Sequence, residues 1–181
     1  MKTLLVVLTS SLLFWSCSRS FAPIEPQAVT LDDEAAVYRA VLNELASEAR
    51  LAAVIPDSTE NFTIEPSEGL QKALPELKEE TLADFNLINR AGHPLRLPRN
   101  LAIKVYQANR RDIPPIFELK TKFPDATAVV ELSRIGFNAD RTQALVYRSI
   151  FWGPLAAVGE LVLLTKTDGW TITATAVVWI S

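Results

Sequence analysis

Residues 127–180 contain four segments with the composition of β-strands, and this pattern limits the fold more than any other feature of the sequence. β-branched and apolar residues fill Thr127–Phe137, Gln143–Ile150, Gly159–Lys166 and Trp170–Ile180. Turn-forming residues separate two pairs of these strands, at Asn138–Arg141 and at Thr167–Gly169. Strands joined by such short turns pair antiparallel, so we expect a C-terminal antiparallel meander. Strict alternation in the last strand predicts that its even-numbered residues share one face.

The connection between the second and third strands, Phe151–Val158, is predicted to be a loop. Gly153 and Pro154 interrupt the strand pattern there, and a proline cannot donate a backbone hydrogen bond to a sheet. Phe151 and Trp152 place two aromatic side chains in this connection. Two interpretations stay open, a patch that binds a partner and a flap over the core.

Helix patterns precede the meander. Val37, Val41 and Leu45 recur at helical spacing and predict an amphipathic helix near the start of the domain. Further helices are expected at Leu70–Leu74 and Lys78–Asn89, and further strands at Leu51–Ile55 and Ala102–Tyr106. Amphipathic helices and sheets each need an apolar partner, so we predict one α+β domain over residues 31–181, with N-terminal helices packed on one face of the meander. A cone-shaped α+β roll with a pocket is the second fold considered.

The N-terminus has the layout of a secretory signal. Lys2 precedes a mostly apolar run that is shorter than the roughly 20 residues needed to span a bilayer, which indicates a signal peptide over residues 1–16. The sequence Phe14-Trp15-Ser16-Cys17 resembles a bacterial lipobox. By that resemblance Cys17 is the lipid attachment site, and residues 17–30 carry the lipidated cysteine and a tether. Cleavage after Ser18, which would remove Cys17, is the alternative.

Three stretches of the domain resemble a known kind of protein. Leu132–Asn138 with Arg141–Tyr147 form the pattern Ser-Arg-x-Gly-Phe-Asn-x-x-Arg-Thr-Gln-Ala-Leu-Val-Tyr, and Asp168-Gly169-Trp170 and Trp179-Ile180-Ser181 follow. Together they are similar to an uncharacterised bacterial domain of exported and lipid-anchored proteins. The resemblance implies a fold and a cellular setting. It implies no activity.

The composition restricts the chemistry of the chain. Eighteen Lys and Arg against 21 Asp and Glu give a net charge of −3, and the sequence has no basic block for nucleic acid. A single Cys and a single His exclude a Cys/His zinc site. Neither a glycine-rich phosphate loop nor a Gly-x-Ser-x-Gly motif occurs in the sequence. We therefore predict no catalytic residue, metal or cofactor, which favours a non-catalytic protein over an enzyme.

The residues best suited to binding lie in the meander. Arg134, Asn138, Asp140 and Arg141 surround its first turn and are able to bind an anion or a partner. We favour the structural interpretation, in which Asn138 and Asp140 cap the turn and an arginine pairs with Asp140. Phe151 and Trp152 are the other candidates. The carboxylates on or beside the hairpins that a hydrolase would use are Glu118, Glu131, Asp140 and Glu160.

These features predict an exported protein of the bacterial cell envelope, anchored by a lipid on the periplasmic or outer face of a membrane. Ser18 after the cysteine favours the outer membrane if the cell has one, by resemblance to lipoprotein sorting. The expected role is binding or structural, with another envelope protein as the partner. The alternative is a carboxylate-based hydrolase or small-ligand-binding enzyme with a roll-type pocket.

The lipid assignment predicts that Cys17→Ser releases the protein from membranes. Acyl chains on the cysteine supply the attachment, at about 0.8 kcal/mol for each buried CH₂ group. Membrane and soluble fractions would be compared by immunoblot. A mutant that stays in the membrane fraction after its signal peptide has been removed would contradict the assignment.

Overall fold

A computed structural model describes residues 31–47 and 51–181 of the chain. The predicted signal peptide, Cys17 and the tether lie outside the described residues. Within the described ranges no helix is long and apolar enough to cross a membrane. The elements in chain order are α1 (Leu31–Glu44), η1 (Leu45–Ser47), β1 (Ala52–Pro56), α2 (Glu68–Ala73), α3 (Glu79–Ile88), β2 (Lys104–Ala108), η2 (Arg110–Asp112), η3 (Ile116–Glu118), α4 (Leu119–Lys122), β3 (Ala128–Leu132), β4 (Gly136–Phe137), β5 (Gln143–Gly153), β6 (Ala156–Lys166) and β7 (Trp170–Ile180).

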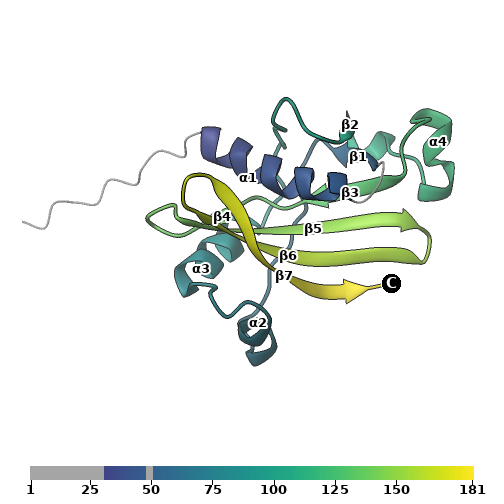
Figure 1. Ribbon diagram of the computed structural model, residues 1–181. Helices are drawn as coiled ribbons and strands as arrows, with labels where there is room; N and C mark the ends of the chain where they lie inside the picture. Colours follow the sequence, from purple (N-terminus) through teal and green to yellow (C-terminus); the bar gives the residue numbers. More distant parts are fainter. Residues whose placement is uncertain (1–30, 48–50) are drawn as a thin grey trace, which may run out of the picture.

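The strands form one mixed sheet in the order β2-β1-β3-β5-β6-β7, with the short β4 also paired to β5 (Figure 1). The β3, β5, β6 and β7 strands pair antiparallel, whereas β1 lies parallel to both β2 and β3. The α+β class is confirmed. The predicted antiparallel meander is present as β3, β5, β6 and β7. The sequence did not predict that β1 joins its edge in parallel, which the long connections between β1, β2 and β3 allow.

Both faces of this sheet are covered, which corrects the prediction that the helices cover one face. In β5, the even-numbered Ala144 and Val146 join one core cluster with residues of α1, and the odd-numbered Leu145 and Tyr147 join another with residues of α2 and α3. Figure 1 shows α1 on one side of the sheet and α2 and α3 on the other. A central strand that is apolar on both faces requires a layer on each side.

The segment predicted as a loop at Phe151–Val158 is a tight hairpin. Strand β5 continues to Gly153, and β6 begins at Ala156. Phe151 pairs with Ala157 and Gly153 with Ala156, so that Trp152 lies at a bulge between them. The prediction failed because Pro154 lies in the turn itself, where its missing N–H removes no hydrogen bond from the sheet.

Strand β7 changes faces part of the way along, which the strict alternation did not predict. Leu164 pairs with Ile172 and Leu163 with Ala174, so Thr173 is an additional residue in a β-bulge. Trp170 and Ile172 therefore pack in the cluster on the α1 side, and Ala174 and Ala176 pack in the cluster on the α2 side. A sequence pattern of period two cannot register an inserted residue of this kind.

A close approach between α3 and β4 makes Gly136 sensitive to substitution. A Cβ atom at Gly136 would collide with the backbone of Phe85, whereas a Cβ at Gly169 would meet nothing within 4 Å. We expect Gly136→Ala to lower the free energy of unfolding by about 1–3 kcal/mol, and the control Gly169→Ala to change it by under about 0.5 kcal/mol. Urea unfolding of the two variants measures this. Equal stability would show that α3 can move away from β4 without cost.

Candidate functional site

The polar candidates of the first meander turn do not form one site. The Asn138 side-chain oxygen accepts hydrogen bonds from the backbone N–H groups of Thr142 (2.9 Å) and Gln143 (2.7 Å), and the residue is buried. Asp140 is exposed and forms no ion pair within the described part of the chain, so the expected pair with an arginine is not present. Arg141 instead lies 3.7 Å from Asp33 of α1 and over the ring of Phe137.

The two aromatic candidates, Phe151 and Trp152, also lie in different places. Phe151 lines a cleft on the α4 side of the sheet, together with Arg110 and Glu131. Trp152 is 43% exposed and lines a different hollow, against Ile116 and Lys120. Phe151 and the carboxylate Glu131, both named from the sequence, therefore meet in one cavity.

This cavity, the Glu131 cleft, has a volume of about 350 Å³ and lies between the sheet and the η2–η3 segment. Its walls are mostly apolar and come from Ile113, Ile116, Val129 and Phe151. Arg110 and Glu131 are its charged lining residues. An apolar cavity with a few converging polar groups is the usual form of a ligand site.

One arginine joins two carboxylates at the cleft. Arg110 donates to Glu131 at 2.5 Å and to Glu60 at 2.8 Å. The Glu131 side chain is 18% exposed, against 33% for Glu60 and 40% for Arg110. The backbone N–H of Glu60 donates to the Leu132 carbonyl at 2.8 Å, which holds this loop against the end of β3. The group carries a net negative charge.

A line of polar and aromatic side chains continues from Glu131 across the sheet. Ser149, directly opposite Glu131 in the β3–β5 pairing, donates to its carboxylate at 3.3 Å. Two residues before it, Tyr147 accepts a hydrogen bond at 2.9 Å from the indole N–H of Trp179. The Trp179 ring lies over Gly159, where any side chain would collide with it. Phe62 stacks on Tyr147 with 3.8 Å between ring centroids.

Burial raises the pKa of two residues in this line of side chains, Glu131 and Tyr147. The pKa of Glu131 is raised above its ordinary value, first by burial and further by the negative charge of Glu60, although Arg110 opposes the shift. Burial likewise raises the pKa of Tyr147. Removing a carboxylate from water disfavours its charged form, and perturbed groups of this kind concentrate at functional sites.

The arrangement is suited to binding more than to nucleophilic catalysis. Ser149 is buried and has no imidazole beside it, because His93 lines a separate pocket with Arg96 and Arg134. In the described ranges, no three His, Cys, Asp or Glu side chains are grouped so that they could hold a metal ion. The cleft instead offers an apolar wall and a carboxylate that accepts hydrogen bonds from a ligand carrying a donor.

Sequence reasoning included Glu131 among the carboxylates and missed Glu60 and Arg110. Both missed residues lie outside the meander, in a polar loop and in the polar turn after β2, and nothing in their local sequence distinguishes them. The useful signal was Glu131 itself, a charge within an apolar strand. The remaining carboxylates lie elsewhere: Glu160 pairs with Arg148 at 2.8 Å on the α1 side, and Glu118 is exposed.

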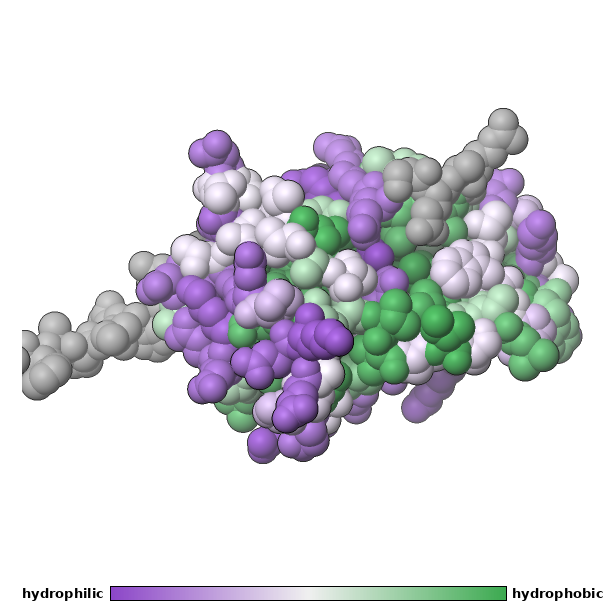
Figure 2. Space-filling model, turned by 60° about the horizontal axis from the view of Figure 1, so that its bottom comes forward, coloured by the Kyte–Doolittle hydropathy of each residue, from purple (hydrophilic) through white to green (hydrophobic). Residues whose placement is uncertain are grey.

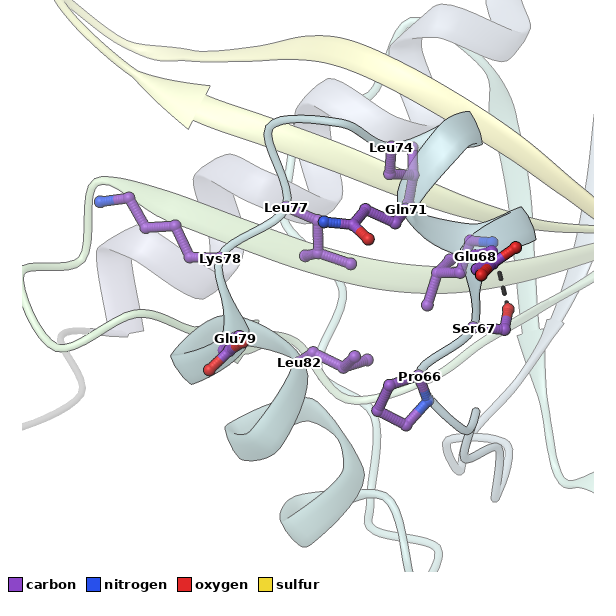
Figure 3. Close-up of a pocket in the computed structure, with 10 residues that line it drawn as sticks. Pro66, Ser67, Glu68, Gln71, Leu74, Leu77, Lys78, Glu79 and Leu82 are labelled. Carbon is purple, nitrogen blue, oxygen red and sulfur yellow. Dashed lines mark hydrogen bonds between the residues drawn. The ribbon is translucent and has the colours of Figure 1, made fainter.

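Another cavity, of about 320 Å³, separates α2 from α3 (Figure 3). Leu74, Leu77 and Leu82 line it, whereas Lys78 extends away from these leucines. Ser67 is occupied in capping α2, since its hydroxyl accepts from the Leu70 N–H at 3.1 Å. The cavity therefore has the character of a gap between two short amphipathic helices.

Apolar side chains also reach the surface near the sheet edge. Figure 2, which brings the side of α2 and β7 forward, shows a group of apolar side chains there. The exposed apolar residues of the β5–β6 turn and of β7 are Leu155, Val177 and Ile180. These three side chains carry no polar group that would select a ligand, so the Glu131 cleft is the better candidate.

Comparison with known proteins finds no matching family model, no matching curated protein and no matching solved structure. The resemblance to an uncharacterised exported domain therefore stays a prediction.

The raised pKa of Glu131 gives a stability prediction with a definite sign. A folded-state pKa above the unfolded value of about 4.5 means that the folded state binds more protons between these two values, so ionisation of Glu131 lowers stability as the pH rises. Glu131→Gln removes this contribution. We expect the stability of the variant relative to wild type to improve as the pH rises from about 4.5 through the folded-state pKa of Glu131.

Denaturant unfolding at several pH values measures this difference, with the exposed Glu118→Gln as control. The stability difference between the variant and wild type could instead stay constant, or the variant could lose stability relative to wild type as the pH rises. Either result would show that the ion pair with Arg110 outweighs burial in setting the pKa of Glu131.

Proposed function

We propose that this chain is an exported bacterial envelope protein, held on a membrane by a lipid at Cys17, whose domain binds a ligand or an envelope partner without catalysing a reaction. Support for export and anchoring comes from the charged-then-apolar N-terminus, which ends at the single cysteine of the chain. In this proposal residues 17–30 are a tether, and the anchored face is periplasmic or external.

The domain that this tether presents is taken as one unit over residues 31–181. Within this domain, the N-terminal helix is proposed to pack against the C-terminal meander. Support comes from the buried residues that α1 shares with the sheet, including Val37, Val41 and Leu42. A single rigid unit would present the Glu131 cleft at a fixed orientation at the end of the tether.

The observation that carries the binding function is the environment of Glu131. A half-buried carboxylate with a raised pKa faces an apolar cleft and is held by Arg110. A charge in such a place costs free energy unless it is paired, and natural proteins concentrate such costs at functional sites. Phe151 supplies an aromatic surface in the same cleft.

A carboxylate-based hydrolase is the second candidate, because Glu60 and Glu131 both bind one arginine and Glu131 is the more buried of the two, which raises its pKa. Two carboxylates with different environments are what acid-catalysed hydrolysis requires. Hydrolysis of a model ester or glycoside that is lost in both Glu131→Gln and Glu60→Gln would favour this candidate over simple binding.

The binding proposal predicts site-specific cross-linking in cells. A photoreactive benzoylphenylalanine in place of Phe151 should form an adduct, and the same group in place of Leu87, exposed on α3, should form none. Arg110→Ala should reduce the Phe151 adduct about tenfold, the effect of losing a charge-assisted hydrogen bond. The neighbouring Arg111→Ala is the matched control.

Adducts are detected by mass shift on denaturing gels. Equal labelling at positions 151 and 87, or labelling that is insensitive to Arg110→Ala, would refute a role for the Glu131 cleft.

A further inference from the structure

A second pocket, on a different part of the molecule from the Glu131 cleft, combines two arginines with the single histidine of the chain. It has a volume of about 250 Å³, and its polar lining includes Arg96, Arg134, His93 and Glu34. Arg134 belongs to the segment between β3 and β4, Arg96 and His93 to the loop after α3, and Glu34 to α1. With Thr59 from the loop after β1, four parts of the chain therefore converge on it.

The backbone around this pocket is well held. The Thr59 N–H donates to the His93 carbonyl at 2.8 Å, and the His93 N–H donates to the Thr59 hydroxyl oxygen at 2.9 Å. The buried Asn89 side chain bonds to both backbone groups of Arg134, accepting from its N–H at 2.8 Å and donating to its carbonyl at 3.1 Å. The Leu95 N–H donates to the Asp57 carbonyl at 2.8 Å, which holds the loop beside Arg96.

The guanidinium groups of the two arginines are not neutralised by neighbouring carboxylates. Among residues 31–47 and 51–181, neither Arg96 nor Arg134 has a carboxylate within ion-pair distance, unlike Arg110 and Arg148. Arg134 forms only a long 3.4 Å hydrogen bond to the Ile88 carbonyl. With Glu34 counted, the pocket keeps an excess of positive charge in a protein whose net charge is −3.

We propose that this pocket binds a phosphate group. Arginine presents a planar fork of donors that fits phosphate or carboxylate oxygens in pairs. Two forks on separate segments favour phosphate, because its oxygens are more numerous, point in more directions and carry more charge than the two coplanar oxygens of a carboxylate. The Thr59 hydroxyl lines the same pocket and has a proton left to donate.

The phosphate could belong to a soluble molecule or to the headgroup of a lipid, and the chemistry recognised is the same. This inference does not depend on the Glu131 cleft, so the two proposals can fail separately. Under the proposed anchoring, a headgroup ligand would hold the domain against the membrane, and a soluble ligand would leave it free on its tether.

Thermal unfolding of the full chain with inorganic phosphate tests the site, with acetate at matched ionic strength as the comparison. Phosphate should raise the melting temperature and acetate should not. Arg96→Gln and Arg134→Gln should each weaken phosphate binding about tenfold in titration calorimetry. Arg99→Gln, a nearby exposed arginine outside the pocket, should bind as wild type does. Because Arg96 is exposed, its variant keeps the test valid if Arg134→Gln fails to fold.

Flotation of Cys17→Ser protein with vesicles identifies the source. Binding to vesicles that contain phosphatidic acid, but not to phosphatidylcholine alone, assigns the pocket to a headgroup, and phosphate binding without flotation assigns it to a soluble phosphate. Stabilisation by acetate equal to that by phosphate, no binding of either probe, or loss of binding in Arg99→Gln as large as in Arg96→Gln would overturn the proposal.

Discussion

The architecture depends on β5, because that strand is buried on both faces from Gln143 to Ile150. A strand of this kind must have neighbours on both edges and a layer on each face, and it obtains them from β3, β4 and β6 and from the helices on either side. The buried arginine of β5 also links this strand to its neighbours. Arg148 pairs with Glu44 of α1 at 2.5 Å and with Glu160 of β6 at 2.8 Å.

The α2 side of the sheet is covered by two separate helical segments. Helices α2 and α3 cover one end, and η3 and α4 cover β1. Between them, Glu131 and Ser149 face each other, and Trp179 can lie across the sheet only because Gly159 has no side chain. The Glu131 cleft is thus a consequence of how the two helical segments divide this face.

The two proposed sites differ in electrostatic character for reasons of local geometry. At the Glu131 cleft, one arginine is shared by two carboxylates, so burial and mutual repulsion act on Glu131. At the second pocket, two arginines meet a single glutamate. A protein of modest net charge can therefore present an acidic and a basic recognition site without a charged block in its sequence. Composition alone predicted no extended polyanion as a partner, and it could not reveal either site.

What the sequence determined by itself was local. The turns at Asn138–Arg141 and Thr167–Gly169, the full extent of β7 and the position of β1 follow from residue periodicity and turn chemistry, which act over a few neighbouring residues. The parallel pairing of β1, the bulge at Thr173 and the meeting of Glu60, Arg110 and Glu131 were decided only by the tertiary structure. These features join segments far apart in the chain. Such contacts form when two distant segments pack with complementary surfaces and the loop between them can close. No local sequence pattern encodes which distant segment will be the partner.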